Sequence, residues 1–249
     1  MLTSRENNNI SSVETLPDYQ LDNLEGMYNY YNWIMTLFAP HLGERILEIG
    51  AGTGTFSRLL ASHNSVVSLV LVEPDPRLNI RLMEDFEEDD RVVVVSSTIE
   101  EMTADMLSSW RIDSIVMVNV LEHLENDSSV LKMLQDALPN GGRILTFSPA
   151  FPVLFSDFDA SAGHFRRYTK KTIHFAFEKA GLKILESSYF NLPGFFIWLF
   201  MMRFLGTSHF GKGKVSMFNR AIPFIQSIEK YWSPPVGQSI VTIAKKVLR

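Results

Sequence analysis

The sequence predicts an α/β fold built on a doubly wound, mostly parallel sheet, and three observations lead to this prediction. Short runs rich in Val and Ile alternate with helical segments from residue 44 onward. These runs lack a clean polar–apolar alternation, which is typical of strands buried on both faces. A glycine-rich turn follows the first run and precedes a helix-like segment. Repeated strand–helix units of this kind form parallel sheets with right-handed crossovers.

Each element follows from the local pattern of residues. Strands are expected at 45–49, 66–72, 91–96, 114–120, 142–147, 182–190 and 239–247. Helices are expected at 55–62, 76–87, 102–109, 127–137 and 169–180. Thr169 is suited to the N-cap of the last helix and Gly181 to the position after its end. The segment 151–167 is expected to be a loop that carries aromatic and charged side chains.

The domain organisation is a short tail followed by one elaborated domain. Residues 1–17 are polar and rich in Asn and Ser, so they are expected to be disordered. Residues 18–249 are expected to form a single domain, because 249 residues suffice for one large domain with additions. Two additions are expected: a helical flap at 18–40 and a helical cap inserted at 192–235, before the last strand.

Composition excludes several classes of function. The net charge of −5 and pI of about 5.7 argue against a general nucleic-acid binder. The chain has no cysteine, which excludes disulfides, thiolate zinc sites and a cysteine nucleophile. No signal peptide is evident, and the apolar stretch 192–205 is shorter than the ~20 residues of a spanning helix. We expect a cytoplasmic protein with possible peripheral membrane contact, and the oligomeric state stays open.

The run Ile46–Gly54 is the most informative part of the chain. An apolar strand bearing Glu48 leads into a turn with glycine at every second position, Gly50, Gly52 and Gly54. Glycine is needed where the backbone adopts positive φ or where a ligand approaches the main chain closely. The order strand, glycine turn, helix is that of a nucleotide cradle.

A second acidic residue supports the nucleotide interpretation. Nineteen residues after Gly54, the second strand ends in Glu73. In a doubly wound sheet, a carboxylate at this position binds the ribose hydroxyls of a nucleoside. Asp75 is interpreted more simply as the N-cap of the next helix.

Four segments taken together resemble the successive motifs of class I S-adenosylmethionine-dependent methyltransferases, in particular bacterial enzymes acting on small molecules. They are Glu48–Gly54, Leu71–Asp75, Thr98–Glu100 and Asn119–Leu124, and the turn Pro139–Gly142 is also typical. The resemblance covers about 44–150 and implies a Rossmann-like sheet whose last strand is antiparallel and lies beside the fifth. It implies S-adenosylmethionine as the cofactor.

The resemblance also implies a role for each matched residue. The glycine turn, including Ala51, holds the amino-acid part of the cofactor, and Glu48 orders that turn. Glu73, followed by Pro74, holds the ribose. The remaining positions flank the adenine or lie near the reacting methyl group: Ile99, Glu100, Asn119 and Val120.

Two alternatives stay open. An NAD-dependent oxidoreductase usually carries G-x-G-x-x-G, but Thr55 or Ser57 stands where its third glycine belongs. No Tyr-x-x-x-Lys catalytic pair is present where a short-chain reductase has one. The second alternative is a non-catalytic subunit that binds the cofactor without turnover.

Candidate catalytic residues follow the fourth and fifth strands. The segment Ser156–Thr169 resembles a Gly-His-x-Arg-Arg-Tyr-[Thr/Ser] segment in a bacterial subgroup of these enzymes, and it contains His164 and Tyr168. His164 is a candidate general base, because the imidazole side chain is the one best suited in general to proton transfer near neutral pH. His123 is a further candidate, with a structural role as its alternative. Arg166 and Arg167 are expected to brace the loop through Asp157 or Asp159. The histidines show no metal-binding spacing, so no metal site is expected.

The insertion at 192–235 suggests the nature of the acceptor. It is rich in Phe and Met and carries several basic residues against the single acid Glu229. Met and Phe in this number form adaptable apolar surfaces, although packing of a helical cap on the sheet explains part of them. We expect a small, lipophilic acceptor, with the attacked atom (O, N or C) left open.

Overall fold

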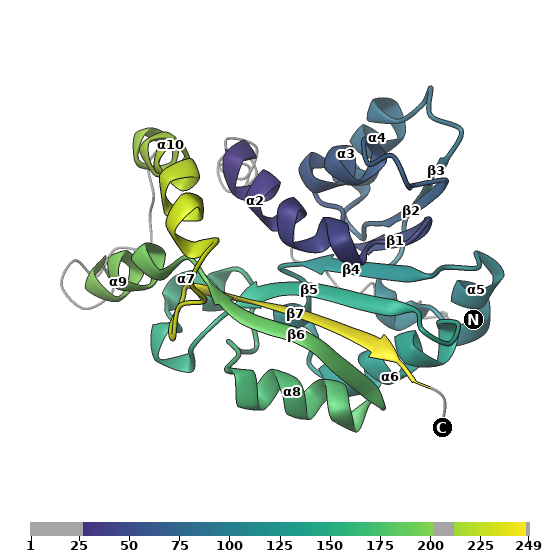
Figure 1. Cartoon of the computed structure of the whole chain (residues 1–249). Helices are drawn as coiled ribbons and strands as arrows, with labels where there is room; N and C mark the ends of the chain where they lie inside the picture. Colours follow the sequence, from purple (N-terminus) through teal and green to yellow (C-terminus); the bar gives the residue numbers. More distant parts are fainter. Residues whose placement is uncertain (1–26, 202–211, 248–249) are drawn as a thin grey trace, which may run out of the picture.

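The computed structural model describes residues 27–201 and 212–247 (Figure 1). The tail expected to be disordered, 1–17, and the first part of the flap lie outside these ranges. The strands are β1 (Arg45–Ile49), β2 (Ser68–Val72), β3 (Val92–Val95), β4 (Ser114–Val118), β5 (Arg143–Pro149), β6 (Leu182–Phe190) and β7 (Ser239–Lys246). The helices are α2 (Tyr28–Phe38), α3 (Thr55–Ala61), α4 (Pro76–Asp85), α5 (Ala104–Ser109), α6 (Asp127–Ala137), α7 (Asp157–Ser161), α8 (Lys170–Lys179), α9 (Leu192–Phe200) and α10 (Lys212–Glu229).

One seven-stranded sheet with the order β3-β2-β1-β4-β5-β7-β6 organises the described residues. The strands β1 to β5 pair in parallel, whereas β7 runs antiparallel between β5 and β6. The expected fold class, including an antiparallel last strand beside the fifth, is therefore confirmed. The order of the strands reverses between β1 and β4, which is where open α/β sheets bind their ligands.

Apolar side chains leave the central strands on both faces, which explains why their sequences do not alternate. Leu47 and Ile49 of β1 belong to the core beneath α5, α6 and α8. Ile46 belongs to the opposite core, which α2, α3, α4 and α10 cover. Figure 1 shows these two helical layers above and below the sheet.

The segment after β5 differs from the expected loop. It contains a 3₁₀ turn at Pro152–Leu154 and the short helix α7. The helix forms because Ser156 and Asp159 make a reciprocal capping box, which satisfies the first backbone N–H groups. The strand expected at 114–120 ends at Val118, since Asn119 adopts a positive φ of 54°.

The inserted helices α9 and α10 connect to the sheet at the carboxyl end of β5. Pro149 at the end of β5 pairs with Ser239, which also pairs with Phe190 at the end of β6. The chain between Phe190 and Ser239 therefore starts and ends level with the carboxyl end of β5. Figure 1 shows α7, α9 and α10 gathered at this end of the sheet.

Candidate active site

The turn after β1 provides a stretch of bare backbone. Gly50, Gly52 and Gly54 all have positive φ, at 72°, 56° and 74°. A Cβ on Gly50 would lie 2.6 Å from Cγ2 of Val120, so the absence of a side chain here makes room for Val120, which follows β4. A Cβ on Gly52 would meet no atom within 4 Å. Gly52 therefore leaves room beside the backbone for a ligand.

Glu73 is joined to this turn by a hydrogen bond. Its Oε2 accepts from the backbone N–H of Gly52 at 2.7 Å, and Oε1 accepts from Asp75 N–H at 2.9 Å. Burial raises the pKa of Glu73, and these two backbone donors oppose that rise. Each carboxylate oxygen has two acceptor sites, so Glu73 keeps capacity for a vicinal diol.

Glu48 lies below the turn and carries an unsatisfied oxygen. The residue is 2% exposed, and its Oε2 has no hydrogen-bond partner. Burial raises the pKa of Glu48 to about 8, and the nearby Ser57 hydroxyl, itself outside hydrogen-bonding geometry, only partly opposes this. A ligand that donates N–H or carries positive charge would satisfy this carboxyl group.

The other cofactor candidates occupy the same edge in different ways. Ile99 is buried and its side chain packs in the core. Glu100 is exposed, and Pro74 and Val120 are half-buried.

The remaining candidates have structural roles near the turn. Gly54 is the N-cap of α3, and a Cβ there would meet Leu82. Ala51 is buried. Asp75 caps α4 by accepting from Arg77 N–H at 2.9 Å, as predicted.

A buried ion pair fixes the position of His164. Arg167 donates to both oxygens of Asp159, at 2.8 and 3.0 Å, and both residues are almost fully buried. The same Oδ1 of Asp159 lies 2.9 Å from Nδ1 of His164. The predicted pairing of Arg167 with Asp159 is confirmed. Arg166 instead pairs with Asp127, at 3.1 Å.

Tyr168 is placed as a brace. Its side chain is 2% exposed, and its hydroxyl donates to Oδ2 of Asp127 at 2.8 Å. Burial, together with the charge of Asp127, raises the pKa of Tyr168 far above its ordinary value. A phenol in this state neither reaches a ligand nor gives up its proton readily, so the geometry favours a structural role.

Glu122 and His123 lie in the 3₁₀ turn Leu121–His123 that follows β4. The backbone N–H of Phe165 donates to the carbonyl of Glu122 at 2.9 Å and holds the His164 loop against this turn. As a result, the rings of His123 and His164 meet edge to face with centroids 4.6 Å apart. Burial lowers the pKa of His123 to about 4.

The burial of Glu122 could not be predicted from the sequence. It is fully buried, and neither carboxylate oxygen has a hydrogen-bond partner. Burial raises the pKa of Glu122 to about 7, opposed chiefly by His164. The nearby Ser148 hydroxyl also lowers this pKa but stays outside hydrogen-bonding geometry. The Glu-His pair at a strand end was visible in the sequence, but its proximity to residue 164 was not.

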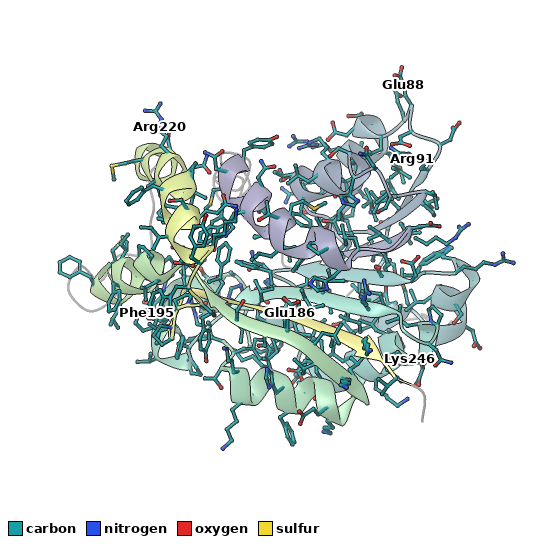
Figure 2. All side chains as sticks on the ribbon, in the orientation of Figure 1. Glu88, Arg91, Glu186, Phe195, Arg220 and Lys246 are labelled. Atoms are coloured by element: carbon teal, nitrogen blue, oxygen red, sulfur yellow. The ribbon has the colours of Figure 1, made fainter. Side chains whose placement is uncertain are left out.

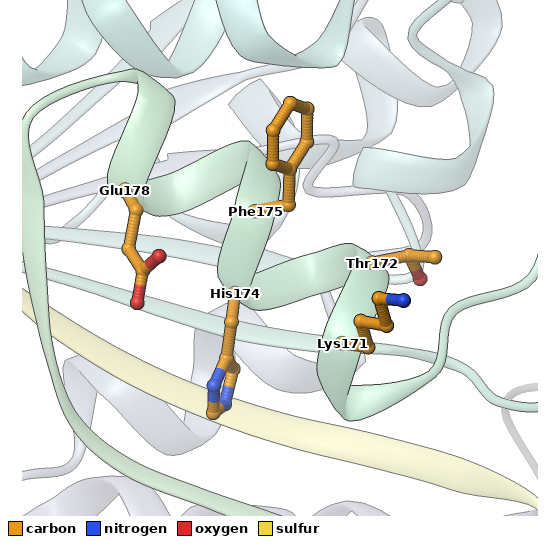
Figure 3. Close-up of a pocket in the computed structure, with 5 residues that line it drawn as sticks. All are labelled: Lys171, Thr172, His174, Phe175 and Glu178. Carbon is orange, nitrogen blue, oxygen red and sulfur yellow. The ribbon is translucent and has the colours of Figure 1, made fainter.

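A separate pocket lies on α8 (Figure 3). It has a volume of about 490 Å³ and is lined by side chains of this one helix, namely Lys171, Thr172, His174, Phe175 and Glu178. None of these residues belongs to the candidate site, and we assign the pocket no role.

A family model described as a methyltransferase domain matches residues 25–187. The chain belongs to this family. The prediction of a class I methyltransferase is thus confirmed, and the family and the fold together support S-adenosylmethionine as the methyl donor. The match favours methyl transfer over the oxidoreductase alternative. A search of curated protein sequences gave no match.

Solved structures share the fold at low sequence identity. An S-adenosylmethionine-dependent methyltransferase from Mesorhizobium loti is 13% identical with a TM-score of 0.60, over 90% of this chain and 100% of that one. Phosphoethanolamine N-methyltransferase 2 from Haemonchus contortus, bound to S-adenosylmethionine, is 16% identical with a TM-score of 0.62, over 93% and 58%. The (4+2)-cyclase SpnF is 12% identical with a TM-score of 0.58, over 89% and 82%.

These neighbours show the fold and leave the acceptor open. A cyclase among them illustrates that a site, and not a fold, decides the reaction. Within residues 27–201 and 212–247, no helix has the length and apolar character to cross a bilayer.

Proposed function

We propose that this methyltransferase acts on an oxygen, nitrogen or carbon of a small acceptor with an apolar body. The observation that carries the proposal is an aromatic wall beside the His164 loop. Trp198 of α9 contacts Phe158 of α7 with ring centroids 5.5 Å apart, and its Nε1 donates to the carbonyl of Leu154 at 3.1 Å. Phe158 directly precedes Asp159, so the wall adjoins the group that positions His164.

The wall extends along α9 towards β6. Phe151 contacts Phe195 and Tyr189, with centroids at 5.3 and 4.6 Å. Figure 2 shows Phe195 among the side chains packed at this end of the sheet, and Arg220 of α10 projecting away from it. Large apolar side chains on both inserted helices are also exposed, among them Phe196, Met217 and Phe224. Exposed apolar side chains beside the aromatic wall support the proposal of an apolar acceptor, because contiguous apolar surface is typical of binding sites.

The cofactor residues that we propose are the ones whose geometry fits a nucleoside with an amino-acid tail. The open backbone at Gly52 admits the ligand, Glu73 offers acceptors for the ribose, and Glu48 has an oxygen that lacks a donor. When bound, the cofactor supplies a sulfonium methyl group, whose C–S electron pair returns to sulfur as the acceptor's lone pair forms the new bond.

We assign His164 the role of general base for acceptors that must lose a proton. Asp159 occupies Nδ1, so a neutral ring carries its proton there and presents Nε2 as the acceptor. The proton of the attacking O–H or N–H group passes to Nε2 and then to water. Holding the acceptor in line matters as much as this transfer, because oriented reactants react far faster than free ones.

A two-stage experiment tests the proposal. Titration with S-adenosylmethionine and with S-adenosylhomocysteine should show binding of both, with the product at least as tight. An acceptor panel of alcohols, phenols and amines, matched in reacting group but graded in apolar size, should then show kcat/KM rising with apolar area. Methylation confined to the small polar members would contradict the apolar acceptor. Binding of both nucleosides without turnover of any member would support the non-catalytic alternative.

The residue assignments have their own controls. A Phe196→Ser variant should raise KM for large apolar acceptors while leaving S-adenosylmethionine affinity unchanged, since Phe196 is 56% exposed on α9. A His164→Gln variant should lower kcat most for acceptors that must lose a proton from an O–H or N–H group, and least for acceptors that need no deprotonation. Equal loss for both classes would place His164 outside proton transfer.

A further inference from the structure

Three side chains that commonly bind metals converge at the carboxyl end of β4. Glu122, His123 and His164 each offer one ligand atom, and these atoms all lie within 4.8 Å of one another. They come from two segments separated by about forty residues of chain, the 3₁₀ turn after β4 and the loop after α7. Ligands of one ion lie about 3–4 Å apart when bond lengths are ~2.1 Å, so small side-chain rotations suffice to close the set.

Glu122 provides a second observation that points to a missing partner. Its side chain is fully buried, and both carboxylate oxygens lack any hydrogen bond. Buried polar groups in native proteins are almost always paired, because leaving one unsatisfied is energetically costly. A group that supplied positive charge at this point would remove that cost.

The surroundings of the histidines suit metal ligation. Asp159 engages Nδ1 of His164 at 2.9 Å and is itself held by Arg167. A carboxylate on the second ring nitrogen is the usual partner of a metal-ligating histidine, since it fixes the tautomer and the ring orientation. The His123 ring lies edge to face against that of His164.

We propose that Glu122, His123 and His164 form a binding site for a divalent transition-metal ion. Two imidazoles and one carboxylate suit Zn²⁺, Fe²⁺ or Mn²⁺ better than Mg²⁺ or Ca²⁺, which prefer sets made only of oxygen. Three protein ligands leave coordination positions for water or another molecule. Such a site would depart from the expectation drawn from the sequence, in which the histidines show no metal-binding spacing.

One consequence rests on the proposed function. An ion bound to Nε2 of His164 uses the lone pair that would otherwise accept a proton. The ion would instead bind the acceptor's heteroatom and lower the pKa of the acceptor's hydroxyl or amine group, as Zn²⁺ lowers the pKa of bound water. Methylation of hydroxyl acceptors should then depend on the metal, whereas the binding site itself does not depend on the identity of the acceptor.

The test measures metal binding directly, on full-length protein freed of affinity tags and treated with a chelator, without cofactor. Co²⁺ should bind at one ion per chain and give visible d–d absorption bands, and Zn²⁺ should displace it. Isothermal titration with Zn²⁺ provides the affinity. Both readouts are independent of catalysis, so they separate this proposal from the proposed function.

Variants assign the binding to the three residues. Glu122→Gln, His123→Gln and His164→Gln should each weaken Zn²⁺ binding by at least tenfold and abolish the Co²⁺ bands. The matched control is His63→Gln, which alters a histidine that follows α3 and contacts Ser65 outside the cluster. Thermal unfolding of metal-free samples checks that each variant folds.

Zn²⁺ should raise the unfolding temperature of the wild type and of His63→Gln, but not of His164→Gln. Asp159→Asn offers an independent check on orientation, with an expected loss of 10–100-fold in affinity. Absence of one-to-one binding in the wild type, or wild-type affinity in all three ligand variants, would overturn the proposal.

Discussion

Gly52 and Gly54 share a left-handed backbone but differ in what a methyl group would meet. A Cβ on Gly52 has open space around it, whereas one on Gly54 would lie 2.8 Å from Cδ2 of Leu82. The left-handed conformation costs an L-residue ~1–2 kcal/mol at either position. The two glycines therefore serve different purposes, close approach of a ligand at one and packing of α3 against α4 at the other.

Replacement by alanine should separate these purposes. Gly52→Ala should lower affinity for S-adenosylmethionine by tenfold or more while reducing stability only by the backbone strain. Gly54→Ala should reduce stability further, because Leu82 must move. Isothermal titration and chemical denaturation of both variants test this. A loss of affinity in Gly54→Ala alone would reverse the assignment.

Glu73 should contribute to cofactor affinity through its charge. Glu73→Gln keeps the shape but weakens the hydrogen bonds to a ribose diol, so affinity should fall by ~10–100-fold. Glu73→Lys should abolish measurable binding. The control is Glu84→Gln, an exposed position near the C-terminal end of α4. Unchanged affinity in Glu73→Lys would remove the basis for the cofactor site.

Glu48 should make the cofactor-free protein sensitive to pH. Its pKa rises from 4.5 to about 8 on folding, so the folded state binds more protons than the unfolded state between these values. The resulting stability is fully present below pH 4.5 and is lost as the pH rises through 8. Glu48→Gln should therefore be more stable than the wild type at pH 8.5, by on the order of a few kcal/mol.

Denaturation at pH 5 and pH 8.5 measures the effect for both proteins. The difference between wild type and Glu48→Gln should be small at pH 5 and large at pH 8.5. A difference that is independent of pH would mean that the carboxyl group is not neutralised by burial.

The helix α10 stabilises two other helices through single side chains. Oδ1 of Asn219 accepts from the backbone N–H of Asn29, at 3.0 Å, and so caps the start of α2, which has no cap of its own. Glu229 accepts from the backbone N–H groups of Asn191 and Leu192 at the start of α9. The contact between Asn219 and Asn29 thereby links α10 to α2 across 190 residues of sequence.

Loss of the cap on α2 should be measurable. Asn219→Ala should destabilise the protein by ~1 kcal/mol, the ordinary value for an N-cap. Ser227→Ala is the matched control, because that hydroxyl donates to the carbonyl of Phe224 in the same helix. Equal stability of the two variants, measured by denaturation, would show that α2 does not need this contact.

At this scale, the sequence predicts well those helix ends whose capping contacts come from residues close by in the sequence. The cap of α8 by Thr169 and that of α4 by Asp75 depend on neighbours within three residues, and both are as predicted. The capping box that forms α7 is equally local, but the charged residues around it mask its pattern in the sequence. The cap of α2 could not be predicted, since its partner lies 190 residues away.

The same reasoning explains which parts of the site were accessible from sequence. The glycine turn is contiguous, so its positive φ values follow from the residues themselves. The neighbourhood of Glu122 and His164 depends on how the loop after β5 folds back on the turn after β4, through the hydrogen bond from Phe165 to Glu122. No periodicity or spacing encodes that contact.

Across the whole molecule, the switch point between β1 and β4 separates two sets of groups with different tasks. On the β1 side lie bare backbone and carboxylates suited to a nucleoside. On the β4 and β5 side lie imidazoles, a buried ion pair and aromatic rings. A transferred methyl group would pass from the first set to the second across the carboxyl edge of the sheet.

Cofactor binding should stabilise the whole domain by mass action. S-adenosylmethionine at 100 times its Kd should raise the free energy of unfolding by ~2.7 kcal/mol, provided that the unfolded chain does not bind it. The increase should be absent in Glu73→Lys and should not be reproduced by NADH. Thermal unfolding with each ligand tests this, and stabilisation by NADH would contradict the family assignment.

The two ends of the inserted segment are fastened to each other. Gln238 N–H donates to the carbonyl of Asn191 at 3.1 Å, and the Asn191 amide donates back to the Gln238 side chain at 2.8 Å. These hydrogen bonds hold the two ends of the inserted segment together. The length of that segment can therefore change without displacing β6 or β7. Substrate preference can therefore evolve through changes in the inserted segment while the residues that bind the methyl donor stay the same. Residues 191 and 238 are suitable junctions for grafting a cap from another protein.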